Sequence, residues 1–459
     1  MLEAFPPEVI GLCRQLSRAG HEAFVVGGAV RDLLLGRPVH DYDIATSALP
    51  EQMLQLFPRA IPTGLKHGTV TILVHGEPVE VTTYRVDGPC SDGRHPDRVT
   101  FVRSLEEDLA RRDFTINALA LDPVTGALRD PFGGRTDLAA RLVRAVGEPC
   151  RRFAEDHLRV LRAVRFATVL DFQLDPATWD AACQAAGCLA TVSAERVRDE
   201  LLKLLLTARP SRGLRLLLES GMLAVILPEL LPLVGQEQNH HHVHDVWGHT
   251  LVAVDTVSST LELRLAALLH DVGKPTTAQP HPAGGCRFHG HEEASAGIAD
   301  GVLQRLKLST RQRERIVHLI RHHMFIALLD GQPVTDAAIR RFLHRVGPET
   351  LPDLLELGRA DLVGTGRAAA AVDGLLAAFR ARVAALLAGP VVTKLADLAI
   401  DGQDVMKALG CPPGRHVGDL LRRLEARVVD EPELNRREDL LRLLAELAPP
   451  GSLPGPARG

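Results

Sequence analysis

Two aspartates, Asp41 and Asp43, stand one residue apart in the run DYDIAT. In an extended strand, residues i and i+2 point to the same face, so the two carboxylates would repel each other unless a cation neutralises them. Hard oxygen ligands of this kind suit Mg²⁺, which can activate an attacking hydroxyl and stabilise the leaving oxygens of a triphosphate. An isolated DxD is more often a solvated turn, so the neighbouring residues must decide between the two interpretations.

The run FVVGGAVRDLLLG precedes these aspartates. Its apolar start predicts a strand that leads into Gly27 and Gly28, and we expect a helix to begin near Ala29. Glycines at this place let backbone N–H groups approach a phosphate, and Arg31 adds a fork of positive donors in the first turn. A bare Gly-Gly is typical of a structural turn, but beside the aspartates it favours a metal and triphosphate site. Glu80 is the best-placed third carboxylate, although an ordinary outward-facing strand glutamate fits equally well.

A second charged group has helical spacing, because Asp156, Arg159, Arg162 and Arg165 recur at every third residue. Residues 141–170 hold seven arginines and three acidic residues, in a chain whose net charge is −4. Such a stripe is commonly a solvated helix face. It could also read nucleobases, because a carboxylate accepts from the amine that cytosine and adenine share, while a guanidinium donates to ring acceptors. Uracil and guanine lack that amine, and the unpaired group would cost ~1–3 kcal/mol.

The elements that must position these residues change character along the chain. Short Val- and Thr-rich runs before about residue 145 predict strands among helices, and the later segments carry apolar residues at helical spacing. The 459 residues are 46% hydrophobic and 24% charged, with a mean hydropathy of +0.04, which indicates folded domains. The seven cysteines form no CxxC pair, and we find neither an apolar run long enough for a membrane span nor a secretory leader, so we expect a cytoplasmic protein without membrane contact.

Five runs appear in an order that resembles the tRNA CCA-adding enzymes and bacterial poly(A) polymerases, the class II branch of the polymerase-β-like nucleotidyltransferases. They are GGAVRDLLLG…DYDIAT, RRDFTINALALD, DPFGGRTDL, EDHLRVLRAVRF and ERVRDELLKLL. The resemblance implies Mg²⁺ at Asp41 and Asp43, and reading of C and A by Asp156 and Arg159. It also implies nucleotide binding by Arg112, Arg162 and Arg165, with Asp113 near the sugar, although Asp113 and Asn117 could equally brace a helix.

Twelve of the 20 histidines lie between His240 and His323, in runs whose order resembles the HD superfamily of metal phosphohydrolases. The resemblance implies a second divalent metal held by His270 and the adjacent Asp271, with His249 and Asp361 completing the minimal set. We consider His291 and His322 as extra ligands. Each histidine taken alone is more often a core or surface residue than a ligand.

We therefore predict an α+β fold: a polymerase-β-like head with a small mixed sheet, followed by an all-α neck, HD domain and tail. The predicted domains are the catalytic head (1–145), the nucleotide-reading and RNA-binding neck (146–235), the HD domain (236–376) and the tRNA-binding tail (377–459). The predicted activity is template-independent addition of C and A to the tRNA 3′ end from CTP and ATP, with release of pyrophosphate, and an accessory HD phosphohydrolase activity. The sequence does not predict the oligomeric state.

Two alternatives stay open. An A-only-adding enzyme or a poly(A) polymerase would share the same runs. However, the loop 85–101 has the full length typical of enzymes that add A, and a GRRF-like poly(A) polymerase run is absent after Thr63. The other alternative is an HD metal phosphohydrolase whose head only binds RNA; the intact Gly-Gly and DxD runs argue against it.

Overall fold

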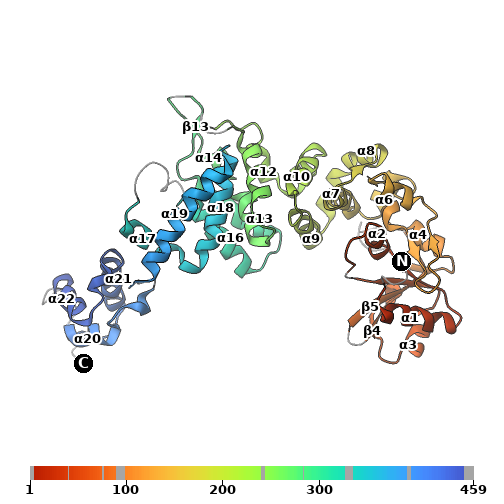
Figure 1. The fold of residues 1–459 in the computed structure, drawn as a ribbon, viewed down its shortest axis with the longest axis horizontal. Helices are drawn as coiled ribbons and strands as arrows, with labels where there is room; N and C mark the ends of the chain where they lie inside the picture. The colour runs from red at the N-terminus through yellow and green to blue at the C-terminus, as the bar shows by residue number, and fades with distance from the viewer. Residues whose placement is uncertain are drawn as a thin grey trace. The chain divides into compact units, whose positions relative to one another are not determined.

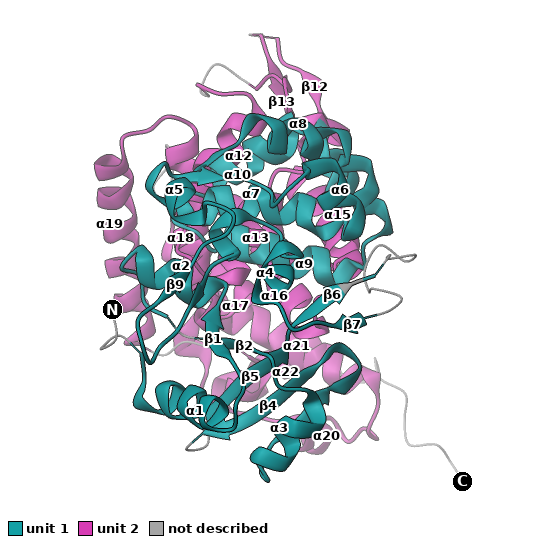
Figure 2. Cartoon of the chain, turned by 90° about the vertical axis from the view of Figure 1, so that its right-hand side faces the viewer, with its two compact units in different colours: residues 1–231 teal, residues 232–459 magenta. Residues whose placement is uncertain are grey.

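The chain forms two compact units, Met1–Leu231 and Pro232–Gly459, which are coloured separately in Figure 2. The computed structural model describes residues 5–39, 41–74, 77–88, 99–238, 243–282, 284–325, 334–389 and 394–448.

The head of the first unit is built on a seven-stranded mixed sheet of order β3-β4-β5-β2-β1-β8-β9. Only β2 and β5 run parallel, and the other neighbours are antiparallel. All four residues of β1 are buried, because this apolar run lies in the interior of the sheet between β2 and β8. The strands are β1 (Ala23–Val26), β2 (Asp43–Thr46), β3 (Ile61–Gly64), β4 (Thr69–Val74), β5 (Glu77–Thr83), β8 (Ala120–Leu121) and β9 (Leu128–Arg129).

Short helices pack against this sheet. In α1, the residues Val9, Leu12, Cys13 and Leu16 are buried and share one face, as their helical spacing requires. The head core joins Phe24 and Val26 of β1 to apolar residues from other elements. The helices are α1 (Pro7–Arg18), α2 (Gly28–Leu34), α3 (Pro50–Leu56), α4 (Leu105–Ala110), the 3₁₀ turn η3 (Thr115–Asn117) and α5 (Gly134–Ala139). A two-stranded ribbon, β6 (Arg85–Asp87) with β7 (Val99–Phe101), flanks residues 89–98, so most of the loop considered above lies outside the described residues.

The neck is mostly helical and centres on α7, most of whose residues are buried. Helices α9 and α10 pack against α7 (Figure 1). The neck helices are α6 (Pro149–Glu155), α7 (Leu158–Leu170), α8 (Pro176–Gln184), α9 (Ala194–Leu205), α10 (Pro210–Glu219) and α11 (Met222–Ile226). The prediction of an all-α neck was not exact, because β11 (Gln173–Leu174) forms a short parallel pair with β10 (Leu142–Val143).

The second unit contains two groups of packed helices. Helices α12, α13, α16 and α18 pack against one another, and a separate apolar cluster joins α20, α21 and α22. The main helices are α12 (Val246–Thr256), α13 (Leu261–Leu269), α15 (His291–Arg305), α16 (Thr310–His322), α17 (Asp336–Val346), α18 (Leu351–Gly364), α19 (Ala369–Leu387), α20 (Gly402–Leu409), α21 (Arg415–Asp430) and α22 (Arg437–Leu447). A single two-residue pair, β12 (Gln279–Pro280) with β13 (Cys286–Arg287), interrupts the helices of its described part. No helix in the described ranges combines the length and apolar character needed to cross a membrane.

Candidate active site in the head and candidate metal centre in the second unit

The central strands bring the carboxylates of Asp43 and Glu80 together at one end of β2. Asp43 is the first residue of β2, and it pairs in register with Val26 on β1 and with Glu80 on β5. Asp41 lies before the strand, so the strand geometry considered above applies to Asp43 and not to the pair. The charge of Asp41 nevertheless acts on Asp43: desolvation raises the pKa of Asp43, Arg112 lowers it, and Asp41 raises it further. These neighbouring carboxylates have the hard oxygen donors and the mutual repulsion that suit a divalent cation.

A pocket of about 580 Å³ opens over these strands and receives side chains from both the head and the neck. Ten predicted site residues line it: Gly27, Gly28, Arg31, Asp43, Arg112, Asp113, Asp156, Arg159, Arg162 and Arg165. Glu80, which the sequence left ambiguous, lines it as well. Sequence reasoning missed Arg85, Asp108, Arg111, Phe166 and Arg196, which also line it. Among the described lining residues, eight arginines face five acidic residues, so the pocket favours a polyanion.

The Gly-Gly turn leads directly into α2, which begins at Gly28. Gly27 has a φ of +72°, a conformation that L side chains rarely adopt. A Cβ at Gly27 would lie 2.7 Å from Nη1 of Arg112. Glycine is thus required here both by the turn and by the close approach of Arg112.

Arg31 connects α2 to the neck. Its guanidinium donates to both carboxylate oxygens of Asp32, at 3.0 and 2.7 Å, and to Oδ1 of Asn117 at 2.7 Å. It also lies 5.1 Å from the ring centroid of Phe166 on α7. Arg165 stacks on the same ring at 3.7 Å and forms an ion pair with the buried Glu200 of α9. These contacts fix the two arginines at the pocket wall before any ligand enters.

Asp113 braces the junction of head and neck. Its Oδ2 accepts from Nε and Nη2 of Arg162, at 2.9 and 2.6 Å, and its Oδ1 accepts from Nδ2 of Asn117 at 3.0 Å. Burial would raise the pKa of Asp113, but the charge of Arg162 and these hydrogen bonds hold it well below its usual range. The geometry supports the bracing interpretation of Asp113 and Asn117 that the sequence had left open.

The two residues considered for base reading lie where α6 meets α7. Asp156 accepts from the backbone N–H of Leu158 at 3.1 Å and from Nη2 of Arg196 at 2.8 Å. Arg159 donates from Nη1 to Glu155 at 2.8 Å and from Nη2 to the carbonyl of Arg111 at 2.9 Å. Both side chains line the pocket with their orientations already fixed by protein partners.

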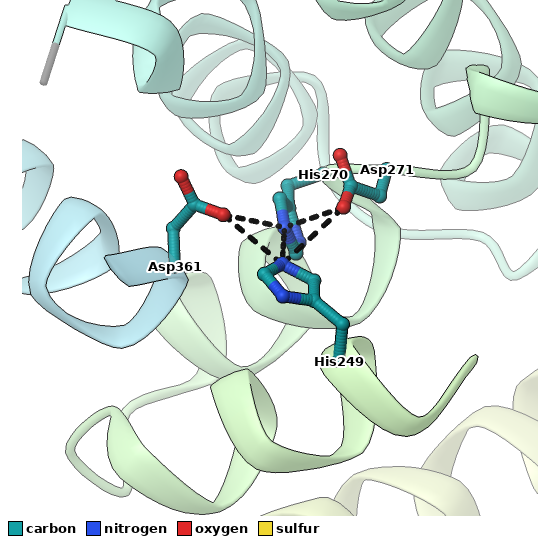
Figure 3. A group of neighbouring side chains, drawn as sticks. All are labelled: His249, His270, Asp271 and Asp361. Atoms are coloured by element: carbon teal, nitrogen blue, oxygen red, sulfur yellow. Dashed lines mark hydrogen bonds and ion pairs between the residues drawn. The ribbon is translucent and has the colours of Figure 1, made fainter. Parts of the chain in front are cut away.

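In the second unit, four of the predicted metal ligands converge (Figure 3). Nε2 of His249 lies 3.1 Å from Nε2 of His270, 3.3 Å from Oδ2 of Asp271 and 3.0 Å from Oδ1 of Asp361. His249 is on α12, Asp361 is on α18, and the His-Asp pair follows α13. A Cβ on Gly364 would lie 2.7 Å from Nδ1 of His249, so a glycine there lets α18 approach α12.

A second group shares Asp271 with the first. Oδ1 of Asp271 lies 3.3 Å from Nε2 of His291, and Nε2 of His291 lies 3.3 Å from Nε2 of His323. The expectation for His322 was wrong, because it pairs with His318 at 4.7 Å between ring centroids and the next residue faces the group instead. Helical geometry turns consecutive residues by about 100°, and here His323 faces the group while His322 faces His318.

Three of these histidines are oriented by main-chain carbonyls. Nδ1 of His270 donates to Ala267, Nδ1 of His291 to Phe288 and Nδ1 of His323 to Ile320, at 2.8, 2.8 and 2.6 Å. Each Nε2 is therefore directed toward the carboxylates, as in histidines that ligate metals. Burial lowers the pKa of His270, but Asp271 outweighs it and raises the pKa to about 10. The group thus strongly favours a positive charge at its centre.

Comparisons with known proteins agree with this geometry. Three family models match in chain order: the poly A polymerase head domain (residues 23–144), the probable RNA and SrmB-binding site of polymerase A (171–233) and the HD domain (242–355). They define the class of the protein as a poly(A)-polymerase-type head followed by an RNA-binding segment and an HD domain.

Similar sequences and structures narrow the class to one family. The CCA-adding enzyme of Streptococcus suis is 34% identical over 431 residues, which span 92% of each chain. The CCA-adding enzyme of Geobacillus stearothermophilus is 52% identical over 223 residues, 48% of this chain and 55% of that relative, so the chain matches about half the length of this relative. The crystal structure of the Bacillus stearothermophilus CCA-adding enzyme in complex with CTP has a TM-score of 0.73 and 35% identity, covering 96% of this chain and 98% of that one. The chain belongs to the CCA-adding enzyme family.

Proposed function

We propose that this chain adds C, C and A to the 3′ end of tRNA from CTP and ATP and releases pyrophosphate, without a nucleic acid template. The observation that carries the proposal is that one pocket combines the carboxylates of β2 and β5 with Asp156 and Arg159 of the neck. The similarity to CCA-adding enzymes, one of which is described in complex with CTP, supports it. A tRNA substrate would place the reaction in the cytoplasm.

In the proposed reaction, the tRNA 3′-oxygen attacks the α-phosphorus of the nucleotide, and the bond from that phosphorus to the bridging oxygen of pyrophosphate breaks. Asp41 and Asp43 would hold Mg²⁺, with Glu80 beside Asp43. Mg²⁺ bound there would supply charge stabilisation for the attacking and leaving oxygens. Arg31 and Arg112, next to the Gly27–Gly28 turn, would orient the triphosphate by charge-assisted hydrogen bonds.

Base selection would follow from fixed donors and acceptors. Each carboxylate oxygen of Asp156 already accepts one hydrogen bond and retains a second lone pair. That lone pair can accept from the exocyclic amine of cytosine or adenine, while Arg159 donates to a ring acceptor. Because protein contacts hold both side chains, no nucleic acid template is needed to present this pattern. Arg162 and Arg165 would help to shape the same wall.

The experiment that tests the transferase proposal uses a tRNA that lacks its 3′ CCA, incubated with CTP alone, ATP alone or both. We expect two residues to be added from CTP, and a third only when ATP is also present. Addition of A alone would indicate an A-only enzyme, and continuous extension with ATP would indicate a poly(A) polymerase. Absence of any incorporation by the folded protein would contradict the proposal.

Substitution of the acidic pair is the matching test of the chemistry. We expect Asp41→Ala and Asp43→Ala to lower the rate of CTP incorporation by about three orders of magnitude, because several kcal/mol of charge stabilisation would be lost. Circular dichroism should show a retained fold, since neither side chain is among the buried residues of the core. Glu77→Ala, which removes an exposed carboxylate of β5 outside the pocket, serves as the control. Normal incorporation by Asp41→Ala would refute the role of the pair.

We also propose that the second unit binds one or two divalent metals and hydrolyses a phosphate ester. The specific observation is the convergence of the group His249, His270, Asp271 and Asp361 with a second group that shares Asp271. We further propose that the functional division follows the predicted boundaries, with catalysis in 1–145, base reading and RNA binding in 146–235, the HD site in 236–376 and tRNA binding in 377–459.

A further inference from the structure

We infer that Asp108 is a positioning residue of the head pocket, and that it holds the guanidinium groups of Arg111 and Arg112 where a triphosphate enters. The inference rests on the nucleotidyl transfer proposed above. Asp108 lies on α4, is 1% exposed and lines the pocket. It belongs to none of the five sequence runs that pointed to the activity, so its position in the pocket comes from the tertiary structure.

The carboxylate of Asp108 joins three neighbours through its two oxygens. Oδ1 accepts from Nε and Nη2 of Arg111, at 3.1 and 2.8 Å, and from the backbone N–H of Arg85 at 3.2 Å. Oδ2 lies 3.7 Å from Nη2 of Arg112. Arg85 begins β6, so the same carboxylate also fixes the first residue of the ribbon.

The contact with Arg112 is loose, in contrast to the close contact with Arg111. Within the described part of the chain, Oδ2 of Asp108 and Nε of Arg112 are both buried, and neither has a hydrogen-bond partner. Buried polar groups in folded proteins are nearly always paired, so the free donor of Arg112 at the pocket wall points to an anionic ligand as its partner, whereas Oδ2 of Asp108 is an acceptor that faces Arg112 itself. Arg112 is the donor that such a ligand would engage.

The carboxylate of Asp108 would weaken triphosphate binding if it contributed only its negative charge. Burial lowers the pKa of Arg112, Asp108 acts against this, and the adjacent Arg111 adds to the lowering. Without Asp108, the neighbouring guanidinium groups would repel each other and leave their positions. Asp108 therefore weakens the attraction of the pocket for a triphosphate, but it fixes the positions of the arginine donors that would bind the triphosphate.

The charge and the positioning interpretations predict opposite signs for Asp108→Asn, which preserves the shape of the side chain and an acceptor for Arg85. If Asp108 only reduced the positive potential, its neutralisation would tighten triphosphate binding. If it positions the arginines, we expect the KM for CTP and the inhibition constant of inorganic tripolyphosphate to rise together by about ten-fold. The preference for CTP over UTP should stay unchanged, because tripolyphosphate binding and Asp108 involve no base contact.

The control is Asp137→Asn, since Asp137 is another buried head carboxylate, and it pairs with Arg144 outside the pocket. It should lose thermal stability to a similar extent with unchanged KM and tripolyphosphate inhibition. Asp108→Ser, which also removes the charge, is measured in parallel in case Asp108→Asn cannot be purified. Unchanged or tighter tripolyphosphate binding in the Asp108 variant would overturn the inference. Calorimetric titration with tripolyphosphate requires no transfer reaction, so failure of the proposed function would be recognised separately in the wild-type assay.

Discussion

At the scale of single residues, the proposed base selection depends on two side chains that protein contacts hold in place. Asp156 is held between a backbone N–H and Arg196, and Arg159 between Glu155 and a main-chain carbonyl. Neither side chain can rotate to suit a different base without breaking these contacts. Preorganised donors and acceptors of this kind discriminate because a wrong base leaves a buried group unpaired.

We therefore expect Asp156→Ala to lose selectivity more than speed. The ratio of kcat/KM for CTP to that for UTP should fall by about 10- to 100-fold, which corresponds to ~1–3 kcal/mol for one unpaired buried group. Single-nucleotide incorporation into a tRNA lacking CCA measures this ratio. Asp199→Ala, on the exposed side of α9, should leave the ratio unchanged. An unaltered ratio in Asp156→Ala would show that base selection lies elsewhere.

At the scale of elements, the segment 113–117, which ends in η3, joins the head to the neck through its contact with α7. Asp113 and Asn117 belong to the head, Arg162 belongs to α7, and Arg31 reaches the same place from α2. The rings of Phe114 and Phe166 form a T-shaped pair, 5.6 Å between centroids, and add an apolar contact to this junction. The proposed reaction requires a rigid junction, because the head carboxylates and the proposed base-reading residues would act on one nucleotide.

The ion pair at this junction predicts a pH-dependent stability. The pKa of Asp113 in the folded chain lies well below its ordinary value of 3.8. Its contribution is thus complete above about pH 4 and is lost as the pH falls toward the folded-state pKa. Urea unfolding should show Asp113→Asn less stable than the wild type by about 2 kcal/mol at pH 7, with a smaller difference below pH 4. The exposed Asp180→Asn should change stability by less than about 0.5 kcal/mol; a pH-independent difference for Asp113→Asn would argue against the ion pair.

At the scale of the whole molecule, the chain separates its two candidate sites into two compact units. All residues that line the head pocket lie in Met1–Leu231, and both candidate metal-binding groups lie in Pro232–Gly459. Each unit has an apolar cluster of its own. The family resemblance read from the sequence is confirmed over nearly the full length of the Streptococcus suis relative.

This separation predicts that each site can be removed without the other. Asp271 contributes to both metal-binding groups, so Asp271→Asn should abolish divalent metal binding by the second unit, measured by elemental analysis after dialysis against EDTA and reloading. CTP incorporation by the same protein should change by less than about two-fold, because Asp271 lies outside the pocket. Asp43→Ala should lose CTP incorporation and retain divalent metal binding by the second unit. Parallel loss of both properties in Asp271→Asn would contradict the independence of the sites.

The sequence by itself determined the residues with local signatures. The apolar run into Gly27, the aspartates of DYDIAT and the three-residue spacing in α7 all depend on neighbours in the chain, so periodicity and residue type were sufficient to find them. The family, the mixed-sheet head and the mostly helical remainder followed from the same runs, and the fold agrees with these predictions.

The tertiary structure alone decided what depends on contacts between distant segments. Glu80 lies in the head pocket because β5 pairs in parallel with β2, and Arg196 lies there because α9 packs against α7. The direction of one helix turn, set by packing, placed His323 rather than His322 at the metal group. Asp108 carries no local signal, since only burial beside two arginines distinguishes it from any other acidic residue on a helix. Burial and pairing depend on contacts between segments that are distant in the chain, so they cannot be predicted from local sequence patterns.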